Sequence, residues 1–153
     1  MTYVRYDVDG WGVGEMWLDG ERLLLHELPR PVRARAVGDH DHALAARIRR
    51  YFAGEGGDFL DVDLDLEGAT PFEEAVTETL RRVPPGETVT YGELAALAGY
   101  PNAQRAAGTF CARNRFAIVV PCHRVVAVDG LGSYGSLGVG YKRRLLELEG
   151  VSV

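Results

Sequence analysis

The residues best suited to chemistry lie in residues 118–125, Ile-Val-Val-Pro-Cys-His-Arg-Val. A cysteine attacks as its thiolate, and an ordinary thiol is mostly protonated near neutral pH. Cys122 is followed by His123, a candidate base, and Arg124, a source of positive field. Pro121 favours a break in strand pairing, which allows Cys122 and His123 to turn to the same side. The stretch predicts a nucleophilic thiol, with a buried and inert cysteine as the alternative.

The elements after this stretch are expected to hold it in place. Residues 125–128 predict a strand that ends at an Asp-Gly turn. A glycine-rich segment, residues 130–140, leads to a helix expected over residues 141–149 and ended by Gly150. The chemistry would therefore lie between a short strand and a C-terminal helix.

Two short helices are expected just before the stretch. Thr90 and Glu93 form a capping-box pattern that opens the first, and residues 101–113 predict the second. A glycine-containing turn between two helices is typical of a helix-turn-helix, although an ordinary αα-hairpin has the same pattern. The second helix carries Arg105 on a face of small residues that could approach a nucleic-acid backbone closely.

The charge is distributed unevenly along the chain. The formal net charge is −5, which argues weakly against nucleic-acid binding by the chain as a whole. Residues 1–70 hold 14 acids and 8 Lys or Arg, whereas residues 71–153 hold 8 acids and 9 Lys or Arg. No acid lies between Glu93 and Asp129, although four arginines do. A polyanion would meet this segment and avoid the rest.

The composition limits the class of protein. The chain has 153 residues, 46% of them hydrophobic, which is enough for a core in one domain or two small ones. No apolar run is long enough to span a membrane, and the N-terminus does not read as a signal peptide. Cys111 and Cys122 provide no disulfide framework, so we expect a reducing, cytoplasmic setting. We interpret Cys111 as a core residue.

The N-terminal part predicts a small α/β domain. Strands are expected over residues 4–8, 12–18 and 22–28, a helix over residues 44–52 and a half-buried strand over residues 60–67, where apolar and acidic residues alternate. A second capping box, Thr70 with Glu73, opens a helix that begins at Pro71. We predict an α/β (α+β) protein with an α/β domain over residues 1–69 and a mainly helical domain over residues 70–153.

Two patterns in the N-terminal part invite a metal interpretation. His40, Asp41 and His42 precede the expected helix, but no cysteine or further histidine supports a metal site. The acidic face of residues 61–67 could hold a hard cation, although a solvated strand face is the commoner role. We therefore predict no metal and no cofactor.

The run Pro-Cys-His-Arg-Val at residues 121–125 resembles the active-site signature of the O6-alkylguanine-DNA alkyltransferases, the methylated-DNA–protein-cysteine methyltransferases. Asn114 upstream and Lys142 and Glu149-Gly150 downstream follow in the order of that family. The patterns Tyr-Gly-Glu-Leu-Ala at residue 91 and Arg-Ala-Ala-Gly at residue 105 resemble it too. The similarity is strongest over residues 71–150. It implies direct reversal of DNA damage by a protein that is used once.

The resemblance assigns roles in the chemistry. Cys122 takes the alkyl group from guanine O6, with O4-alkylthymine as a second candidate substrate, and His123 removes the thiol proton through water. Glu149 orients His123 in a Cys-His-acid relay. Asn114 supports the turn that carries the cysteine, and Tyr91 donates a proton toward guanine N3.

The resemblance also implies how the target base is reached. A base inside a duplex must be flipped out, and Arg105 would fill the space of the extruded nucleotide while Tyr91 lies beside it. The partner would be double-stranded DNA with O6-alkylguanine, bound by a monomer. Further DNA contacts are assigned to Ala106, Ala107, Gly108, Arg113 and Arg124. The alkyl pocket is assigned to Pro121, Val125, Tyr134 and Ser136.

One departure from the family pattern lies beside the site. The family usually has Asn-Pro where this chain has Asn114-Arg115, so we expect Arg115 to add a charge and to loosen the turn. Two other classes of protein remain open. An alkyltransferase-like protein would bind the lesion without transfer, and a cysteine hydrolase would turn over on a peptide or ester with Cys122 and His123.

Overall fold

The computed structural model describes residues 1–31 and 42–153. Contacts divide the chain into two compact units. Unit 1 comprises residues 1–65 together with residues 115–117, and unit 2 comprises residues 66–114 and 118–153. The boundary predicted between residues 69 and 70 lies four residues after the observed one, which falls between residues 65 and 66. Residues 115–117 were expected in the second domain but belong to unit 1. Among the described residues, no helix is long and apolar enough to cross a membrane.

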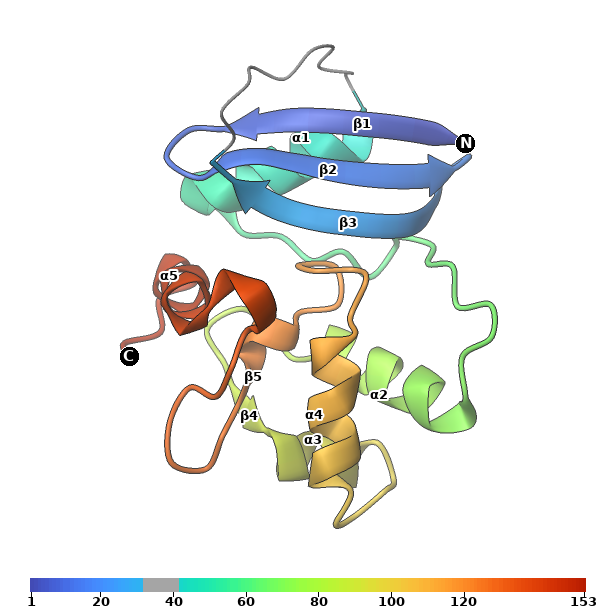
Figure 1. Ribbon diagram of the computed structural model, residues 1–153, viewed down its shortest axis with the longest axis vertical. Coiled ribbons are helices and arrows are strands. Elements are labelled where there is room, and N and C mark those ends of the chain that lie inside the picture. The colour runs from blue at the N-terminus through green and yellow to red at the C-terminus, as the bar shows by residue number, and fades with distance from the viewer. Residues whose placement is uncertain (32–41) are drawn as a thin grey trace. The chain divides into compact units, whose positions relative to one another are not determined.

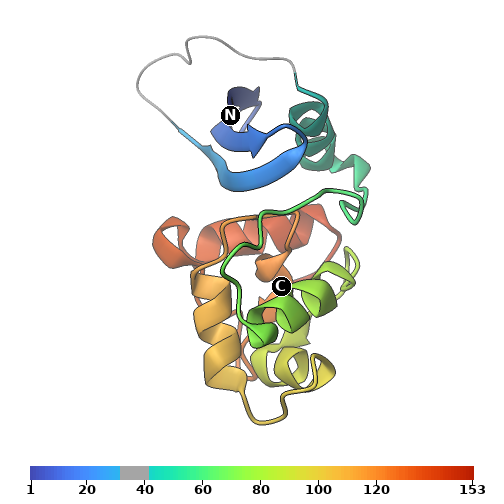
Figure 2. The ribbon, with the colours of Figure 1, turned by 90° about the vertical axis from the view of Figure 1, so that its right-hand side faces the viewer.

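Unit 1 is an antiparallel sheet with a helix against it (Figures 1 and 2). The strands follow in the order β1 (Thr2–Val8), β2 (Gly12–Asp19) and β3 (Arg22–Arg30), with an Asp-Gly pair at each turn between them. The helix α1 (Ala43–Arg50) continues into a π-helical turn, η1 (Tyr51–Glu55). These elements confirm the predicted strand-strand-strand-helix order of the N-terminal part.

The core of unit 1 lies between the sheet and α1. Alternate strand residues such as Val4, Tyr6 and Met16 are completely buried, as is Ile48 on the helix. Gly14 allows the Tyr6 ring to lie directly against β2, because a Cβ at this position would come within 2.2 Å of the ring. The lack of a side chain at Gly14 therefore allows the Tyr6 ring to pack against β2.

The half-buried strand predicted over residues 60–67 is wrong. This segment meets β3 at a single residue, where Leu23 donates to the Asp63 carbonyl at 2.8 Å and accepts from the Asp65 amide at 2.9 Å. Val62 and Leu64 are buried as the alternation predicts, but Leu60 is 49% exposed. An alternating pattern predicts a strand only if a neighbouring edge runs alongside it, and here the segment leaves that edge after one bridge.

Residues 115–117 pair with the same free edge of β3. The His26 amide donates to the Arg115 carbonyl at 2.8 Å, and Phe116 forms a parallel bridge with His26. The His26 ring is buried, and its Nδ1 donates to the Ala117 carbonyl at 2.6 Å. Since Nδ1 carries the proton, Nε2 accepts from the Tyr6 hydroxyl. One histidine therefore ties this distant segment to the sheet.

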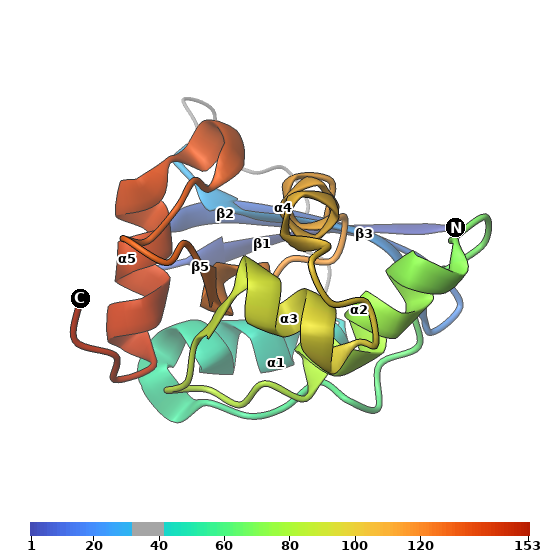
Figure 3. The ribbon, with the colours of Figure 1, turned by 90° about the horizontal axis from the view of Figure 1, so that it is seen from below.

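Unit 2 contains the helices α2 (Pro71–Arg81), α3 (Tyr91–Leu97), α4 (Gln104–Ala112) and α5 (Val139–Leu148), seen from below in Figure 3. Both predicted capping boxes are present: Thr70 pairs with Glu73 at the start of α2, and Thr90 pairs with Glu93 at the start of α3. Each caps two backbone amides that a helix start would leave without partners. Local sequence signals therefore determine where these helices begin.

The helices α3 and α4 pack against each other as the predicted pair, an arrangement that a helix-turn-helix and an ordinary αα-hairpin share. The start of the second helix differs from the prediction, because residues 101–103 form a turn and α4 begins at Gln104. Asn102 has φ of 66°, which an α-helix does not allow. The two helices pack closely, since a Cβ at Gly92 would lie 3.9 Å from the Gln104 Cβ.

The chain around the cysteine forms a turn. Residues 117–120 bend, Ile118 has φ of 72°, and Cys122–Arg124 form a 3-10 turn, η2. The strand predicted over residues 125–128 is confirmed only for β5 (Val125–Val126), which pairs in parallel with β4 (Val89–Thr90). This pairing places the start of α3 next to the residues that follow the cysteine.

The helix α5 ends as predicted at Gly150. Gly150 has φ of 88°, its amide donates to the Glu147 carbonyl, and the Val151 amide donates to the Leu146 carbonyl at 2.9 Å. This is the Schellman pattern of helix ends. Glu149 is consequently the last residue before the chain reverses, and this position sets the direction of its side chain.

We expect His26 to make the stability of unit 1 depend on pH. Burial lowers the pKa of His26 to about 4, against the hydrogen bond to Ala117. The unfolded chain therefore binds the proton first, so the contribution is present above pH 6.5 and is lost as pH falls toward 4, by up to about 3 kcal/mol. Both tryptophans lie in unit 1, so urea unfolding followed by tryptophan fluorescence measures it.

The control for this prediction is His26→Gln, which cannot titrate. We expect the free energy of unfolding of the variant to change less between pH 7 and 4 than that of the wild type. Parallel curves for the two proteins would contradict the prediction.

Candidate active site

Cys122 is enclosed in unit 2 with its sulfur held by an amide. Only 7% of the residue is exposed. The Asn114 side-chain nitrogen donates to the Cys122 sulfur at 3.1 Å and to the Val120 carbonyl at 2.8 Å. The end of α4 is thereby joined to the turn that carries the cysteine. Asn114 occupies the supporting position that the sequence predicted.

His123, Arg124 and Glu149 form a buried cluster. The Nε2 atom of His123 lies 2.8 Å from one oxygen of Glu149, whose side chain is 2% exposed. Arg124 donates to both carboxylate oxygens, at 2.9 and 2.8 Å, and to the Val83 carbonyl at 2.7 Å. Because a carboxylate only accepts, Nε2 carries the ring proton and Nδ1 is the basic nitrogen.

Burial determines the charge states of the nucleophile and the base. It raises the pKa of the Cys122 thiol, and hydrogen bonds from Asn114 and Tyr134 and the charge of Lys142 oppose this only in part. Burial also lowers the pKa of His123, against the hydrogen bond to Glu149. Near neutral pH the site therefore holds a thiol and a neutral imidazole, a nucleophile and a base that have not yet exchanged a proton.

Burial alone would raise the pKa of Glu149, but His123 and Arg124 together hold it well below its usual range. The carboxylate therefore stays charged well below neutral pH. A permanent negative charge at this point stabilises an imidazolium when His123 gains a proton.

Tyr91 and Lys142 complete the polar groups of the site. The Lys142 ammonium lies 5.7 Å from the centre of the Tyr91 ring and donates to the Val125 carbonyl at 2.6 Å. Burial raises the pKa of Tyr91, so its hydroxyl keeps its proton. Gly132 makes room for this hydroxyl, because a Cβ there would come within 2.9 Å of it. The role of Lys142 was not predicted; its place before an apolar helical stripe gave no sign of its burial.

The predicted pocket residues lie around Cys122 to different degrees. Pro121 and Val125 are buried within three residues of the cysteine in sequence, and Tyr134 contributes a hydrogen bond that lowers the thiol pKa. Ser136 is exposed on a short 3-10 turn, η3 (Gly135–Leu137). The structure gives Tyr134 a direct relation to the sulfur and gives Ser136 none.

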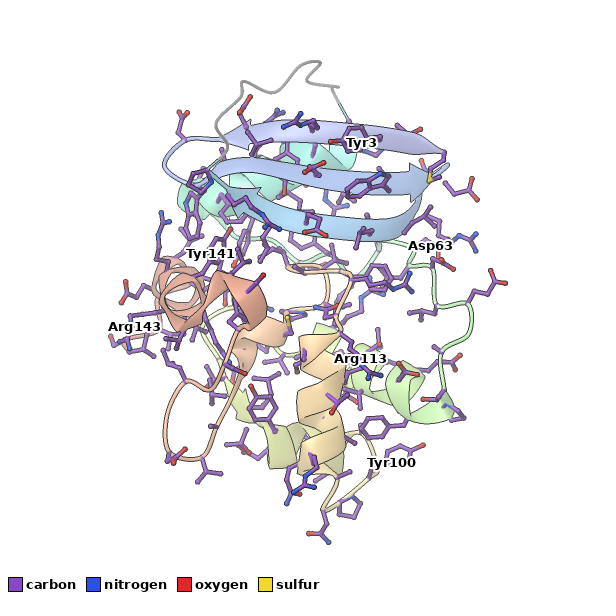
Figure 4. The ribbon with its side chains drawn as sticks, viewed as in Figure 1. Tyr3, Asp63, Tyr100, Arg113, Tyr141 and Arg143 are labelled. Atoms are coloured by element: carbon purple, nitrogen blue, oxygen red, sulfur yellow. The ribbon has the colours of Figure 1, made fainter. Side chains whose placement is uncertain are left out.

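The predicted DNA-contact residues separate into two groups. Arg105, Ala106 and Arg113 are exposed on α4 or at its end, where Figure 4 shows Arg113 and, before the helix, Tyr100. Gly108 is half-buried against the Tyr91 ring. Ala107 is fully buried, so its assignment as a contact is wrong. It faces the core because α4 must bury one side.

The assignment of Arg124 to DNA binding is also wrong. Its guanidinium is engaged with Glu149 and the Val83 carbonyl, and only 6% of the residue is exposed. An arginine next to a nucleophile in sequence does not reveal whether its charge points outward. Here it neutralises a buried carboxylate, without which burial would be costly.

The residues proposed for a metal site and the second cysteine lie apart from this chemistry. Within residues 1–31 and 42–153, no three His, Cys, Asp or Glu side chains are grouped to hold a metal ion. His42 caps α1 by accepting from the Leu44 amide at 3.1 Å, while His40 and Asp41 lie outside the described residues. Burial raises the pKa of Cys111 to about 12, which makes it a poor nucleophile.

We expect Glu149→Gln to destabilise unit 2. The substitution leaves Arg124 buried without its counter-charge, which costs roughly 3 kcal/mol for a buried ion pair. Glu147→Gln, which removes an exposed carboxyl in the last turn of α5, is the control. Thermal unfolding followed by circular dichroism of the helices measures both, and equal stability of the two variants would contradict the expectation.

Comparisons with known proteins point to one family. The family model described as 6-O-methylguanine DNA methyltransferase, DNA binding domain, matches residues 71–151. A methylated-DNA–protein-cysteine methyltransferase of Mycobacterium tuberculosis is 49% identical over 104 residues, which cover 67% of this chain and 61% of the relative. A protein of the same name from Methanopyrus kandleri is 46% identical over 71% of this chain and 80% of the relative.

Solved structures extend the likeness over nearly the whole chain. The structure of Mycobacterium tuberculosis OGT in complex with DNA has a TM-score of 0.81 and 37% identity, covering 97% of this chain and 92% of that one. The O6-methylguanine-DNA methyltransferase of Pyrococcus kodakaraensis has a TM-score of 0.73 and 29% identity, covering 97% and 98%. The family model over residues 71–151 and the identity of the relatives lead to one conclusion: the chain belongs to the 6-O-methylguanine DNA methyltransferase family.

Proposed function

We propose that this protein repairs DNA by transferring an alkyl group from O6 of guanine to Cys122. The observation that carries the proposal is a buried thiol beside a neutral histidine whose tautomer is set by Glu149, within a helix-turn-helix unit. The family membership and the DNA complex of the Mycobacterium tuberculosis relative support the substrate class. O4-alkylthymine remains a second candidate substrate.

The first step is formation of the thiolate. His123 takes the thiol proton of Cys122 at Nδ1 through a water molecule and becomes an imidazolium. The charge of Glu149 stabilises that imidazolium, and the Asn114 amide and the Lys142 ammonium favour the thiolate. Cys122 and His123 are both neutral at rest, so they become charged only when the proton moves from the thiol to the imidazole.

The second step is alkyl transfer. The sulfur attacks the alkyl carbon, the new S–C bond forms, and the O6–C bond breaks with its electrons going to the guanine. Tyr91, which is protonated because of its raised pKa, donates toward guanine N3 and neutralises the departing base. The product is a thioether on Cys122. No group of the described site is suited to cleave it, so each molecule acts once.

Access to the base requires that it leave the duplex. The exposed guanidinium of Arg105 on α4 is suited to fill the vacated space, and Ala106 presents a small side chain that lets the backbone of DNA come close. Arg113 at the end of α4 is suited to a phosphate contact. We propose binding as a monomer to double-stranded DNA, and a reducing cytoplasm in which the thiol stays free.

The test is intact mass after mixing the protein with a duplex that contains O6-methylguanine. We expect one methyl group per protein, located on Cys122 by peptide mass and absent from Cys122→Ser. A duplex with ordinary guanine is the matched substrate control. Tight binding without a mass change would overturn transfer in favour of a lesion-binding protein, and turnover of an ester without DNA binding would favour a hydrolase.

We expect Tyr91→Phe to slow methyl transfer from the duplex by at least about tenfold, because general acid catalysis by a side chain is worth that much or more. Tyr3→Phe, which removes an exposed hydroxyl in unit 1, is the control. Single-turnover rates from quenched samples give the comparison. An unchanged rate for Tyr91→Phe would remove Tyr91 from the mechanism.

A further inference from the structure

The segment between Asn114 and Ile118 belongs to unit 1, although both of its neighbours belong to unit 2. The chain therefore leaves unit 2 after Asn114, lies against the edge of β3 over residues 115–117, and re-enters unit 2 at Ile118. The residues on either side of this segment both bear on the candidate site. Asn114 holds the Cys122 sulfur, and Ile118 begins the turn that leads to the cysteine.

Arg115 holds this segment with its side chain as well as its backbone. Its guanidinium donates to the Asp65 carbonyl at 3.1 Å and to the Leu24 carbonyl at 3.4 Å, and it lies 5.0 Å from the centre of the Phe116 ring. Its own carbonyl accepts from His26. The planar guanidinium fork can serve two carbonyls at once, which a lysine ammonium on a flexible stem does less well. We expected Arg115 to loosen the turn, but its contacts instead hold this segment in place.

The turn beyond the segment needs such restraint. Ile118 has φ of 72°, a conformation that is unfavourable for a β-branched residue and persists only when the surroundings impose it. The Asn114 amide must also reach two acceptors at once, Val120 at 2.8 Å and Cys122 at 3.1 Å. A small rotation of the backbone at residue 114 would break one of these contacts.

We infer that Arg115 is a positioning residue for the nucleophile: by anchoring residues 115–117 to β3 and Asp65 it holds Asn114 in hydrogen-bond contact with Cys122. The inference builds on the proposed function, in which Cys122 is the alkyl acceptor. It also assigns unit 1 a part in the chemistry, because the anchor lies in unit 1 and acts through the peptide bond that joins Arg115 to Asn114.

The test measures Cys122 without DNA. The rate at which iodoacetamide alkylates Cys122 is followed against pH, with the adduct located by peptide mass so that Cys111 is counted separately. Arg115→Ala is compared with Asn114→Ala and with the double variant. Arg22→Ala, which removes an exposed arginine of β3 paired with Asp19, is the matched control.

We expect Arg115→Ala to react about tenfold more slowly than wild type at neutral pH, the change that a rise of about one unit in the thiol pKa produces. Because Arg115 acts through Asn114, we expect the double variant to react no more slowly than Asn114→Ala alone. Arg22→Ala should match the wild type. Arg115→Lys, which keeps the charge and loses the fork, should lie between wild type and Arg115→Ala, and it carries the test if the alanine variant does not fold.

Several results would overturn the inference. A folded Arg115→Ala protein with the wild-type pH profile would do so, and so would a double variant whose loss is the product of the two single losses. A variant that lowers the melting temperature without changing the pH profile would show a structural role only. Failure of the wild type to accept a methyl group from DNA would instead contradict the proposed function, and it would leave the alkylation comparison unaffected.

Discussion

The buried carboxylate of Glu149 is the interaction on which unit 2 depends. A charge with 2% of its side chain exposed is costly unless both oxygens are engaged, and here Arg124 and His123 engage them. Arg124 also donates to the Val83 carbonyl just beyond α2. One carboxylate thus joins the end of α5, the turn that carries the cysteine and the segment after α2, and the same contact determines which nitrogen of His123 is basic.

Burial determines the charge states of this site at rest and limits how fast the resting thiol reacts. The enclosure that raises the pKa of Cys122 and lowers that of His123 keeps both groups neutral at rest. A thiol that is rarely ionised reacts slowly with electrophiles other than the substrate, which suits the single-use role proposed for Cys122. The groups that favour charge, namely Asn114, Lys142 and Glu149, are already in place, so proton transfer needs little rearrangement.

The two units are linked in sequence at places that matter for the chemistry. The helices α3 and α4 lead directly into Asn114, which contacts the Cys122 sulfur, and the next three residues belong to unit 1. The sheet itself is stabilised by a core with a buried His26, whose ring holds the Ala117 carbonyl. Both cysteines of the chain lie in unit 2, and in the inference drawn above unit 1 acts on the chemistry through this short segment.

The sequence by itself determined what short-range physics controls. The capping boxes at Thr70 and Thr90, the end of α5 at Gly150 and the Cys-His pair could be identified because each depends on residues within one or two turns. Tertiary structure decided what depends on distant partners. Residues 60–67 alternate like a strand but find only one residue of edge, Arg124 meets a carboxylate 25 residues away, and residues 115–117 join a sheet some 90 residues earlier in the chain. Long-range pairing leaves no local pattern, because what satisfies a buried charge or a free backbone group is proximity in space.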